Sequence, residues 1–255
     1  MTNANAGESS MRRSGELGDK IKRVHCLFEQ SGTFKNCFRR LGYEAIDYDI
    51  ANDFGETDRK IDLFSEILMG GYNEPSIFDQ IEKDDLILAF FPCIRFEDQV
   101  QLWFRGQNYG QKTWNDAQKI EYCMKLSDEL NEMYKLVCLL FLICLRRGLQ
   151  LVMENPYSEA HYLRRYFCIP STLIDMDRRR NGDYFKKPTQ YWFVNREPKN
   201  NLLMEAIPDN SITGADMIKR MTRKDYQKMG VKNRKVARSM IHPDYADRFI
   251  RQYLI

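Results

Sequence analysis

The stretch from Arg23 to Asp49, RVHCLFEQSGTFKNCFRRLGYEAIDYD, decides the fold. Its first six residues, Arg23–Phe28, are mostly apolar and predict a strand. A polar turn at Glu29–Thr33 leads into an amphipathic helix predicted over Phe34–Leu41, which ends at Gly42. The chain therefore passes from a strand through a tight turn into a helix.

A second strand is predicted over Tyr43–Tyr48, and the acidic residue Asp49 follows it directly. Strand, turn, helix, strand and acid, in this order, place the ribose of a bound cofactor against the carboxylate that ends the second strand. The opening of the chain thus predicts a Rossmann-like unit.

Further strands alternate with helices along the rest of the chain. Strands are predicted over Asp84–Phe90, Leu149–Met153, Ser171–Met176 and Gln190–Val194, with a helix over Ser127–Arg147. This alternation is typical of an open α/β sheet flanked by helices. At 255 residues the chain is long enough for one such domain with an additional segment.

Composition narrows the protein class. The hydrophobic fraction of 43% is ordinary for a globular protein, and the longest apolar stretch, Leu136–Leu145, is too short to span a bilayer. Residues 1–20 are polar and lack the apolar core of a signal peptide, so we expect a disordered tail. These features predict a cytoplasmic protein without a membrane partner.

The cysteines and histidines predict neither disulfides nor a metal site. The seven cysteines are odd in number, and several lie in apolar segments, as reduced buried thiols do. His25, His161 and His242 stand far apart, and no Cys-x-x-Cys pair is present. A monomer without metal is the simplest expectation, and the net charge of +3 alone says little about nucleic acid.

Two short motifs follow predicted strands. Phe91-Pro92-Cys93 follows one strand, and Glu154-Asn155-Pro156 follows the next. They bring a nucleophilic thiol and a carboxylate to the mouth of the sheet, which are the two groups needed for covalent attack on a cytosine ring. Either motif alone would be weak evidence, but together they indicate nucleophilic chemistry on a base.

From about residue 23 to its end, the chain resembles the small DNA cytosine-5 methyltransferases of phages and bacteria. In that family, a Phe and a glycine-rich turn approach S-adenosylmethionine, and here Gln30 stands at a position usually held by glycine. Asp49 matches the ribose acid, and Asp62 is a candidate for the adenine amino group. The resemblance implies a cofactor site of Phe28, Ser31, Gly32, Thr33, Asp49, Asp62, Pro92 and Ser239.

The resemblance also implies the catalytic residues. Cys93 corresponds to the nucleophile, Glu154 to the carboxylate of the base pocket, and Lys187, in place of the usual arginine, to the cation of the motif Gly182–Thr189. Phe91 stands where a second proline is usual. The implied activity is methyl transfer to carbon 5 of cytosine in DNA, with the base flipped out of the duplex.

The C-terminal part is basic and short for a recognition domain. The resemblance divides the chain into a core at 21–195, a reduced basic recognition segment at 196–238, and a C-terminal helix at 239–255 that completes the core. Basic runs contact phosphates, although most are simply solvated helix faces. The predicted DNA-binding residues are Arg105, Arg178, Arg180, Arg234, Lys235 and Arg238.

Some alternatives stay open at this point. The residues between Cys93 and Glu154, which include Trp103 and Trp114, form either a mobile loop that stacks on bases or a surface loop with a small core of its own. The chain is a DNA methyltransferase, an RNA methyltransferase, or a nucleic-acid-binding module of a mobile element that has kept the fold but lost turnover.

Overall fold

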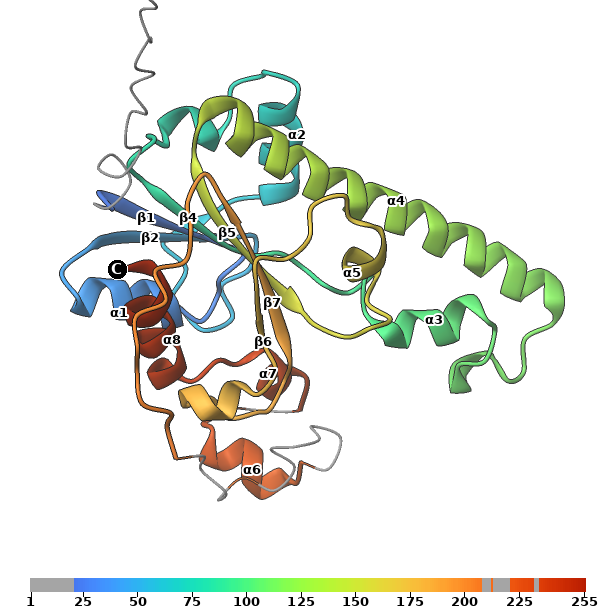
Figure 1. Cartoon of the computed structure of the whole chain (residues 1–255). Coiled ribbons are helices and arrows are strands. Elements are labelled where there is room, and N and C mark those ends of the chain that lie inside the picture. The colour runs from blue at the N-terminus through green and yellow to red at the C-terminus, as the bar shows by residue number, and fades with distance from the viewer. Residues whose placement is uncertain (1–20, 208–211, 213–220, 232–233) are drawn as a thin grey trace, which may run out of the picture.

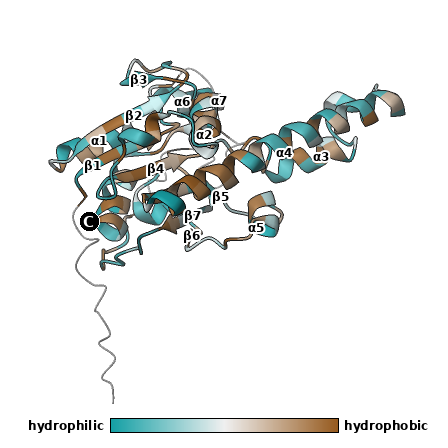
Figure 2. Cartoon of the chain, turned by 90° about the horizontal axis from the view of Figure 1, so that it is seen from above, coloured by the Kyte–Doolittle hydropathy of each residue, from teal (hydrophilic) through white to brown (hydrophobic). Residues whose placement is uncertain are grey.

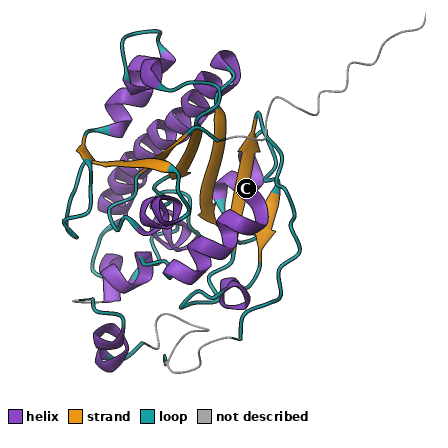
Figure 3. Cartoon of the chain, turned by 90° about the vertical axis from the view of Figure 1, so that its left-hand side faces the viewer, coloured by secondary structure: helices purple, strands orange, loops and turns teal. Residues whose placement is uncertain are grey.

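The computed structural model describes residues 21–207, 212, 221–231 and 234–255, and the side chains of 234 and 235 are outside this description. The predicted disordered tail at 1–20 also lies outside it. The described chain is an α/β protein, as predicted from the sequence, with helices on both faces of a central sheet (Figures 1 and 3).

The seven strands of the sheet are β1 Arg23–Leu27, β2 Glu44–Asp49, β3 Arg59–Lys60, β4 Leu86–Phe90, β5 Gln150–Pro156, β6 Leu173–Asp175 and β7 Thr189–Val194. They lie in the order β3-β2-β1-β4-β5-β7-β6. Neighbouring strands are parallel from β3 to β5, whereas β7 runs antiparallel to β5 and β6. The chain order reverses between β1 and β4, and a crevice for ligands opens at such a reversal, outside the carboxyl ends of the strands.

The helices are α1 Thr33–Arg40, α2 Leu63–Gly71, α3 Asp98–Phe104, α4 Asp116–Arg147, α5 Tyr162–Tyr166, α6 Arg223–Lys228, α7 Arg234–Ser239 and α8 Pro243–Phe249. Shorter helical turns are η1 Ile77–Gln80, η2 Tyr109–Gln111, η3 Arg178–Asn181 and the π-helical η5 Ile250–Leu254. The helices α2 and α4 cover one face of the sheet, and α1 and α8 cover the other (Figure 1).

Alternation along the central strands divides the core into two layers. In β4, Ile87 and Ala89 point into the layer with α2 and α4, while Leu86 and Leu88 point into the layer with α1 and α8. Successive side chains of a strand point to opposite faces, so a strand that is buried on both faces is apolar throughout. Burial on both faces therefore explains the continuous apolar runs from which these strands were predicted.

The helix α4 is longer than the predicted Ser127–Arg147. It begins at Asp116, where Asn115 and Gln118 form a reciprocal capping box, and it ends at Gly148 with a left-handed φ of 69°. Its first turns extend beyond the sheet and mix hydrophilic and hydrophobic residues, whereas the part beside the sheet is largely hydrophobic (Figure 2). An apolar pattern therefore could not reveal where α4 begins.

The segment after Cys93 is helical, and the predicted mobile, base-stacking loop is not found there. The helix α3, the turn η2 and the first half of α4 form a projection from the domain (Figure 1). Trp103 and Trp114 both pack against Tyr122, with ring centroids 5.3 Å and 5.2 Å apart. Of the two alternatives, the segment with a small core of its own describes this region.

The C-terminal residues return to the main domain. Tyr245, Phe249 and Leu254 are buried in the same layer as Phe34 and Phe38 of α1. Ahead of them, α6 and α7 belong to a separate small cluster of buried residues, composed of Phe185, Ile212, Met221, Met229 and Ala237. Among the described residues, no helix is both long enough and apolar enough to cross a membrane.

Candidate active site

A cavity of about 590 Å³ opens at the reversal point between β1 and β4. Six separate segments line it: the turn after β1, the loop after β2, the end of β4, the end of β5, Lys187 shortly before β7, and the stretch around the end of α7. Seven of the residues predicted from the sequence line this cavity, namely Phe28, Ser31, Pro92, Cys93, Glu154, Lys187 and Ser239. The fold thus brings together residues that are up to 211 positions apart in the sequence.

The turn after β1 has an unusual backbone. Phe28, a residue with a side chain, has a φ of 61°, and Gly32, which precedes α1, has a φ of 63°. A Cβ atom at Gly32 would lie 2.9 Å from Glu56 Oε2, at the flexible end of that side chain, so the positive φ is the main reason for glycine there. Gln30 lines the cavity and is not among the residues with positive φ, so its backbone does not require glycine.

Glu29, which the sequence reasoning did not single out, caps α1. It is 5% exposed, and its carboxylate accepts hydrogen bonds from Phe34 N at 2.7 Å and Lys35 N at 3.1 Å. Burial raises the pKa of this carboxyl to about 7, although the two N–H donors oppose the shift. Glu29 thus places a carboxylate that titrates near neutral pH on the wall of the cavity.

The loop that carries Cys93 is fixed from two directions. Phe91 is buried and packs against the rings of Phe28 and Phe96, with centroids 5.3 Å and 6.3 Å away. Asn155 Nδ2, on the neighbouring strand, donates to Phe91 O at 2.7 Å. Phe91 is therefore held by packing, and Asn155 of the Glu-Asn-Pro motif is a positioning residue for this loop, which the sequence analysis did not predict.

Cys93 is half-buried, and its Sγ donates a hydrogen bond to Glu97 Oε1 at 2.9 Å. Burial raises the pKa of the Cys93 thiol far above its usual range, and the nearby carboxylates of Glu97 and Glu154 raise it further, while Lys187 lowers it. In the described conformation, the sulfur is therefore a protonated thiol beside a carboxylate.

Glu154, on β5 beside Phe90, is 7% exposed. Its Oε1 has no hydrogen-bond partner within the described part of the chain, and the nearest cation is Arg178 Nη1 at 3.8 Å. A buried polar atom without a hydrogen bond is costly, and a donor from a ligand could supply the missing bond to this oxygen.

The sequence prediction that Arg178 contacts nucleic acid is wrong in this structure. Arg178 is fully buried, forms an ion pair with Asp183, and lies over the ring of Tyr245 at 4.5 Å from the centroid. Its guanidinium is a buried positive charge 3.8 Å from Glu154, and it cannot reach a phosphate on the surface. A run of three arginines does not reveal from sequence which one turns inward.

Four residues predicted to bind the cofactor do not line the cavity. Gly32 and Thr33 form the buried start of α1. Asp49 ends β2 as predicted, but its Oδ1 accepts from Ala51 N at 2.8 Å. Asp62 is exposed and caps α2 by accepting from Phe64 N at 3.1 Å. Instead, Asp53 and Phe54, in the loop that follows β2, line the cavity.

The remaining predicted DNA-binding residues are at the surface where they are described. Arg105, at the end of α3, and Arg180, which pairs with Glu205 at 3.7 Å, are exposed. Arg238 is exposed on α7, whose residues Val236 and Ser239 line the cavity. The side chains of Arg234 and Lys235 lie outside the described residues.

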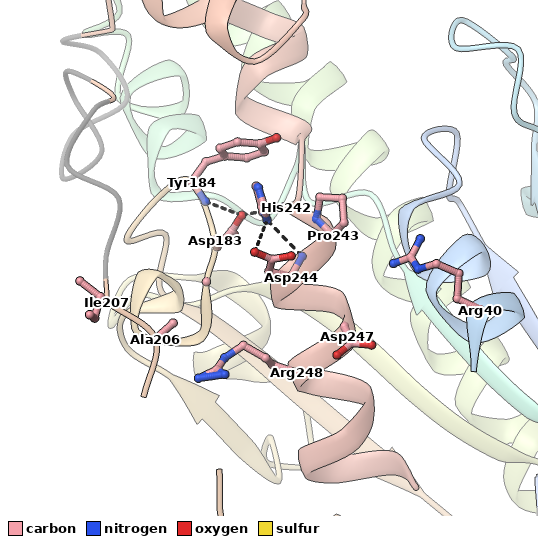
Figure 4. A pocket seen from close by; sticks show the side chains of 11 residues that line it. Arg40, Asp183, Tyr184, Ala206, Ile207, His242, Pro243, Asp244, Asp247 and Arg248 are labelled. Atoms are coloured by element: carbon pink, nitrogen blue, oxygen red, sulfur yellow. Dashed lines mark hydrogen bonds and ion pairs between the residues drawn. The ribbon is translucent and has the colours of Figure 1, made fainter. Parts of the chain in front are cut away.

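A second cavity, of about 610 Å³, contains none of the predicted site residues. Arg40 of α1 lies on one side of it and α8 residues such as Asp247 on the other, while Asp183 Oδ1 accepts from His242 N at 2.9 Å (Figure 4). Neither there nor elsewhere in the described residues do three or more His, Cys, Asp or Glu side chains form a group that could hold a metal ion.

Comparisons with known proteins give no independent assignment. No protein-family model matches the chain, and no curated protein is significantly similar to it. The geometry of the cavity therefore carries the functional argument.

Proposed function

We propose that this chain is an S-adenosylmethionine-dependent methyltransferase that acts on carbon 5 of cytosine in DNA through a covalent adduct with Cys93. One observation carries the proposal: Cys93, Glu154 and Lys187, predicted from three distant motifs, line a single cavity together with residues of the turn after β1. The cavity has the size of a small-molecule site and lies at the crevice where open α/β sheets bind ligands.

The turn after β1 favours this cofactor over a dinucleotide. In dinucleotide-binding folds, the N–H groups at the start of the first helix bind the pyrophosphate. Here Glu29 already accepts from Phe34 N and Lys35 N, and its carboxylate would repel a phosphate at that position. S-adenosylmethionine has no phosphate, and its sulfonium and amino groups are cationic.

The lining residues fit such a cofactor. Phe28, Phe54 and Pro92 offer apolar and aromatic surface, which attracts cations as well as an adenine ring. Glu29 and Asp53 supply carboxylates for the positive groups. When bound, S-adenosylmethionine supplies an electrophilic methyl group.

The residues on the side of the cavity formed by β4, β5 and β7 suit a flipped cytosine. Cys93 adds to carbon 6 and turns the ring into an enamine with a nucleophilic carbon 5. Glu154 has a free Oε1 that binds ring nitrogen 3 and the exocyclic amine, stabilising the charge that develops. Lys187 neutralises negative charge on the ring or on a neighbouring phosphate.

A trapping experiment tests the proposal. A pool of random duplexes that contain 5-fluorocytosine in place of cytosine is incubated with the protein and S-adenosylmethionine, because fluorine at carbon 5 blocks release of the enzyme. We expect an adduct that survives a denaturing gel with the wild type and with Cys168→Ser, which alters an exposed free cysteine. Cys93→Ser should give none.

Other results would redirect the assignment. An adduct that persists in Cys93→Ser would refute the role of Cys93. An adduct with a structured RNA pool but not with duplex DNA would favour an RNA methyltransferase. Binding of cofactor and DNA without any adduct would indicate a module that has lost turnover.

A further inference from the structure

The proton of Cys93 poses a chemical problem for the proposed function. The attacking species must be a thiolate, but burial and the surrounding carboxylates hold the sulfur as a thiol. The groups that act on its proton are Glu97 from the same turn, Glu154 from β5 and the cation Lys187 from the segment before β7. Of these, the structure pairs Glu97 with the sulfur by a hydrogen bond.

The position of Glu97 is specific. It is the residue before the first turn of α3, where a Ser, Thr, Asp or Asn side chain often accepts a hydrogen bond from the helix N–H groups, and Glu97 makes no such capping bond. Its Oε1 instead accepts from Cys93 Sγ at 2.9 Å. The backbone supports this arrangement, because Phe96 N and Glu97 N both donate to Cys93 O, at 2.8 Å and 3.3 Å.

The turn from Cys93 to Glu97 is anchored at several points. Phe96 is buried, and its carbonyl accepts from Tyr162 N at 2.9 Å. Arg95 pairs with Glu129 of α4 at 2.5 Å. The distance between the thiol and the carboxylate is therefore set by the core and by α4, which is the pre-organisation that proton transfer requires.

We propose that Glu97 is the proton acceptor for Cys93: it holds the thiol protonated and unreactive in the resting enzyme and takes its proton when the sulfur attacks the base. This inference rests on the proposed function. The S–H bond breaks, the proton moves to Glu97 Oε1, and the sulfur electron pair forms the bond to carbon 6. The electrons of the 5,6 double bond form a double bond between carbons 4 and 5, and those of the bond between carbon 4 and ring nitrogen 3 move to that nitrogen. The nitrogen takes a proton from water, and the Glu154 carboxylate accepts hydrogen bonds from it and from the exocyclic amine. After methyl transfer, the protons at carbon 5 and ring nitrogen 3 pass to water, the bond between carbon 6 and sulfur breaks with its electrons on sulfur, and the sulfur recovers its proton from Glu97.

The first test needs neither DNA nor cofactor. The alkylation of Cys93 by iodoacetamide is measured by mass spectrometry of its peptide in wild type, Glu97→Gln and Asp98→Asn. Asp98 is the adjacent exposed carboxylate, which bonds Ser158 instead of the sulfur. Since Glu97, and not Asp98, is among the groups that raise the pKa of the thiol, Glu97→Gln should be alkylated faster at pH 8, about tenfold for each pKa unit recovered. Asp98→Asn should match the wild type.

The second test uses the adduct with 5-fluorocytosine DNA between pH 7 and 9. In the wild type, the complex of thiol and carboxylate holds the proton to be transferred, so the rate should vary little with pH. Glu97→Gln must lose the proton to solvent, so its rate should be lower by about 10² or more at pH 7 and rise about tenfold per pH unit. Glu97→Asp keeps a carboxylate and should recover part of the rate with a flat profile.

The outcomes separate the two proposals. If Glu97→Gln is alkylated at the wild-type rate or more slowly, the inference is wrong whatever DNA does. If alkylation accelerates but no protein forms an adduct, Glu97 controls the Cys93 proton and the methyltransferase proposal fails. If the adduct forms in Glu97→Gln at the wild-type rate with a flat pH profile, Glu97 is not the proton acceptor.

Discussion

Glu29 should make the stability of this protein fall as the pH rises through neutrality. Its carboxyl is buried at the start of α1, and its pKa in the folded chain is about 7, against 4.5 when exposed. Because the folded state holds a proton that the unfolded state has lost, the stabilisation is fully present below pH 4.5 and disappears as the pH rises through 7. At about 1.4 kcal/mol per pKa unit, the loss amounts to about 3 kcal/mol.

The assay compares the wild type with Glu29→Gln by urea unfolding at pH 5 and pH 8. Between these values the free energy of unfolding of the wild type should fall, relative to that of the variant, by about 2 to 3 kcal/mol. His161 acts in the opposite sense, because burial lowers its pKa to about 4 and folding is favoured as the pH rises from 4 toward 6.5. It is present in both proteins, so its effect cancels in the difference.

A control removes another carboxylate. Glu121→Gln alters an exposed residue of α4, and its unfolding free energy should follow that of the wild type at both pH values. Parallel pH curves for wild type and Glu29→Gln would refute the reasoning, since they would mean that the carboxyl ionises in the folded chain as it does in water.

Three further predictions concern residues near the cavity that do not line it. Asn155→Asp replaces the donor to Phe91 O and Glu154 O with a repelling oxygen, so urea unfolding should show a loss of about 2 to 4 kcal/mol, and an unchanged stability would show that Asn155 does not position the loop. Gly32→Ala should cost about 1 kcal/mol or more and weaken cofactor binding in calorimetry, more than Gly55→Ala, whose φ is 74° but whose Cβ meets no described atom within 4 Å. Under the proposed function, alanine at Arg234, Lys235 and Arg238 should reduce the slope of log affinity for DNA against log salt concentration by up to about 3, without changing sequence preference. The control, alanine at Lys112, Lys119 and Lys125 of the projection, should leave that slope unchanged. Loss of cofactor binding alone would assign α7 to the cavity wall.

The sequence was most informative where structure is local. The predicted first strand, Arg23–Phe28, is one residue longer than β1. The predicted first helix, Phe34–Leu41, is shifted by one residue from α1. The polar turn separates the strand from the helix, and Gly42 ends the helix because glycine readily adopts the left-handed backbone conformation. Both boundaries therefore depend on local residues only. The motifs that contain Cys93 and Glu154 were recognisable for the same reason, because each follows an apolar run that predicts a buried strand.

The sequence was least informative where a residue's role depends on distant partners. Arg178 looked like its neighbours Arg179 and Arg180, and only Asp183, Glu154 and Tyr245 together make its burial possible. Glu97 stands four residues after Cys93, a spacing that brings two side chains together only if the chain turns there. That turn depends on the burial of Phe96, and no local sequence pattern predicted the turn.

The C-terminal segment has two roles that cannot be separated. Met240 and Ile241 line the cavity, while a few residues later Tyr245 and Phe249 fill the core beside α1. His242 N donates a hydrogen bond to Asp183, Asp183 pairs with Arg178, and Arg178 lies 3.8 Å from Glu154. A substitution that displaces α8 would therefore also displace the wall of the cavity. If the proposed function holds, the base pocket and the cofactor side are braced by one stretch of chain, so substitutions in α8 should weaken cofactor binding and adduct formation together.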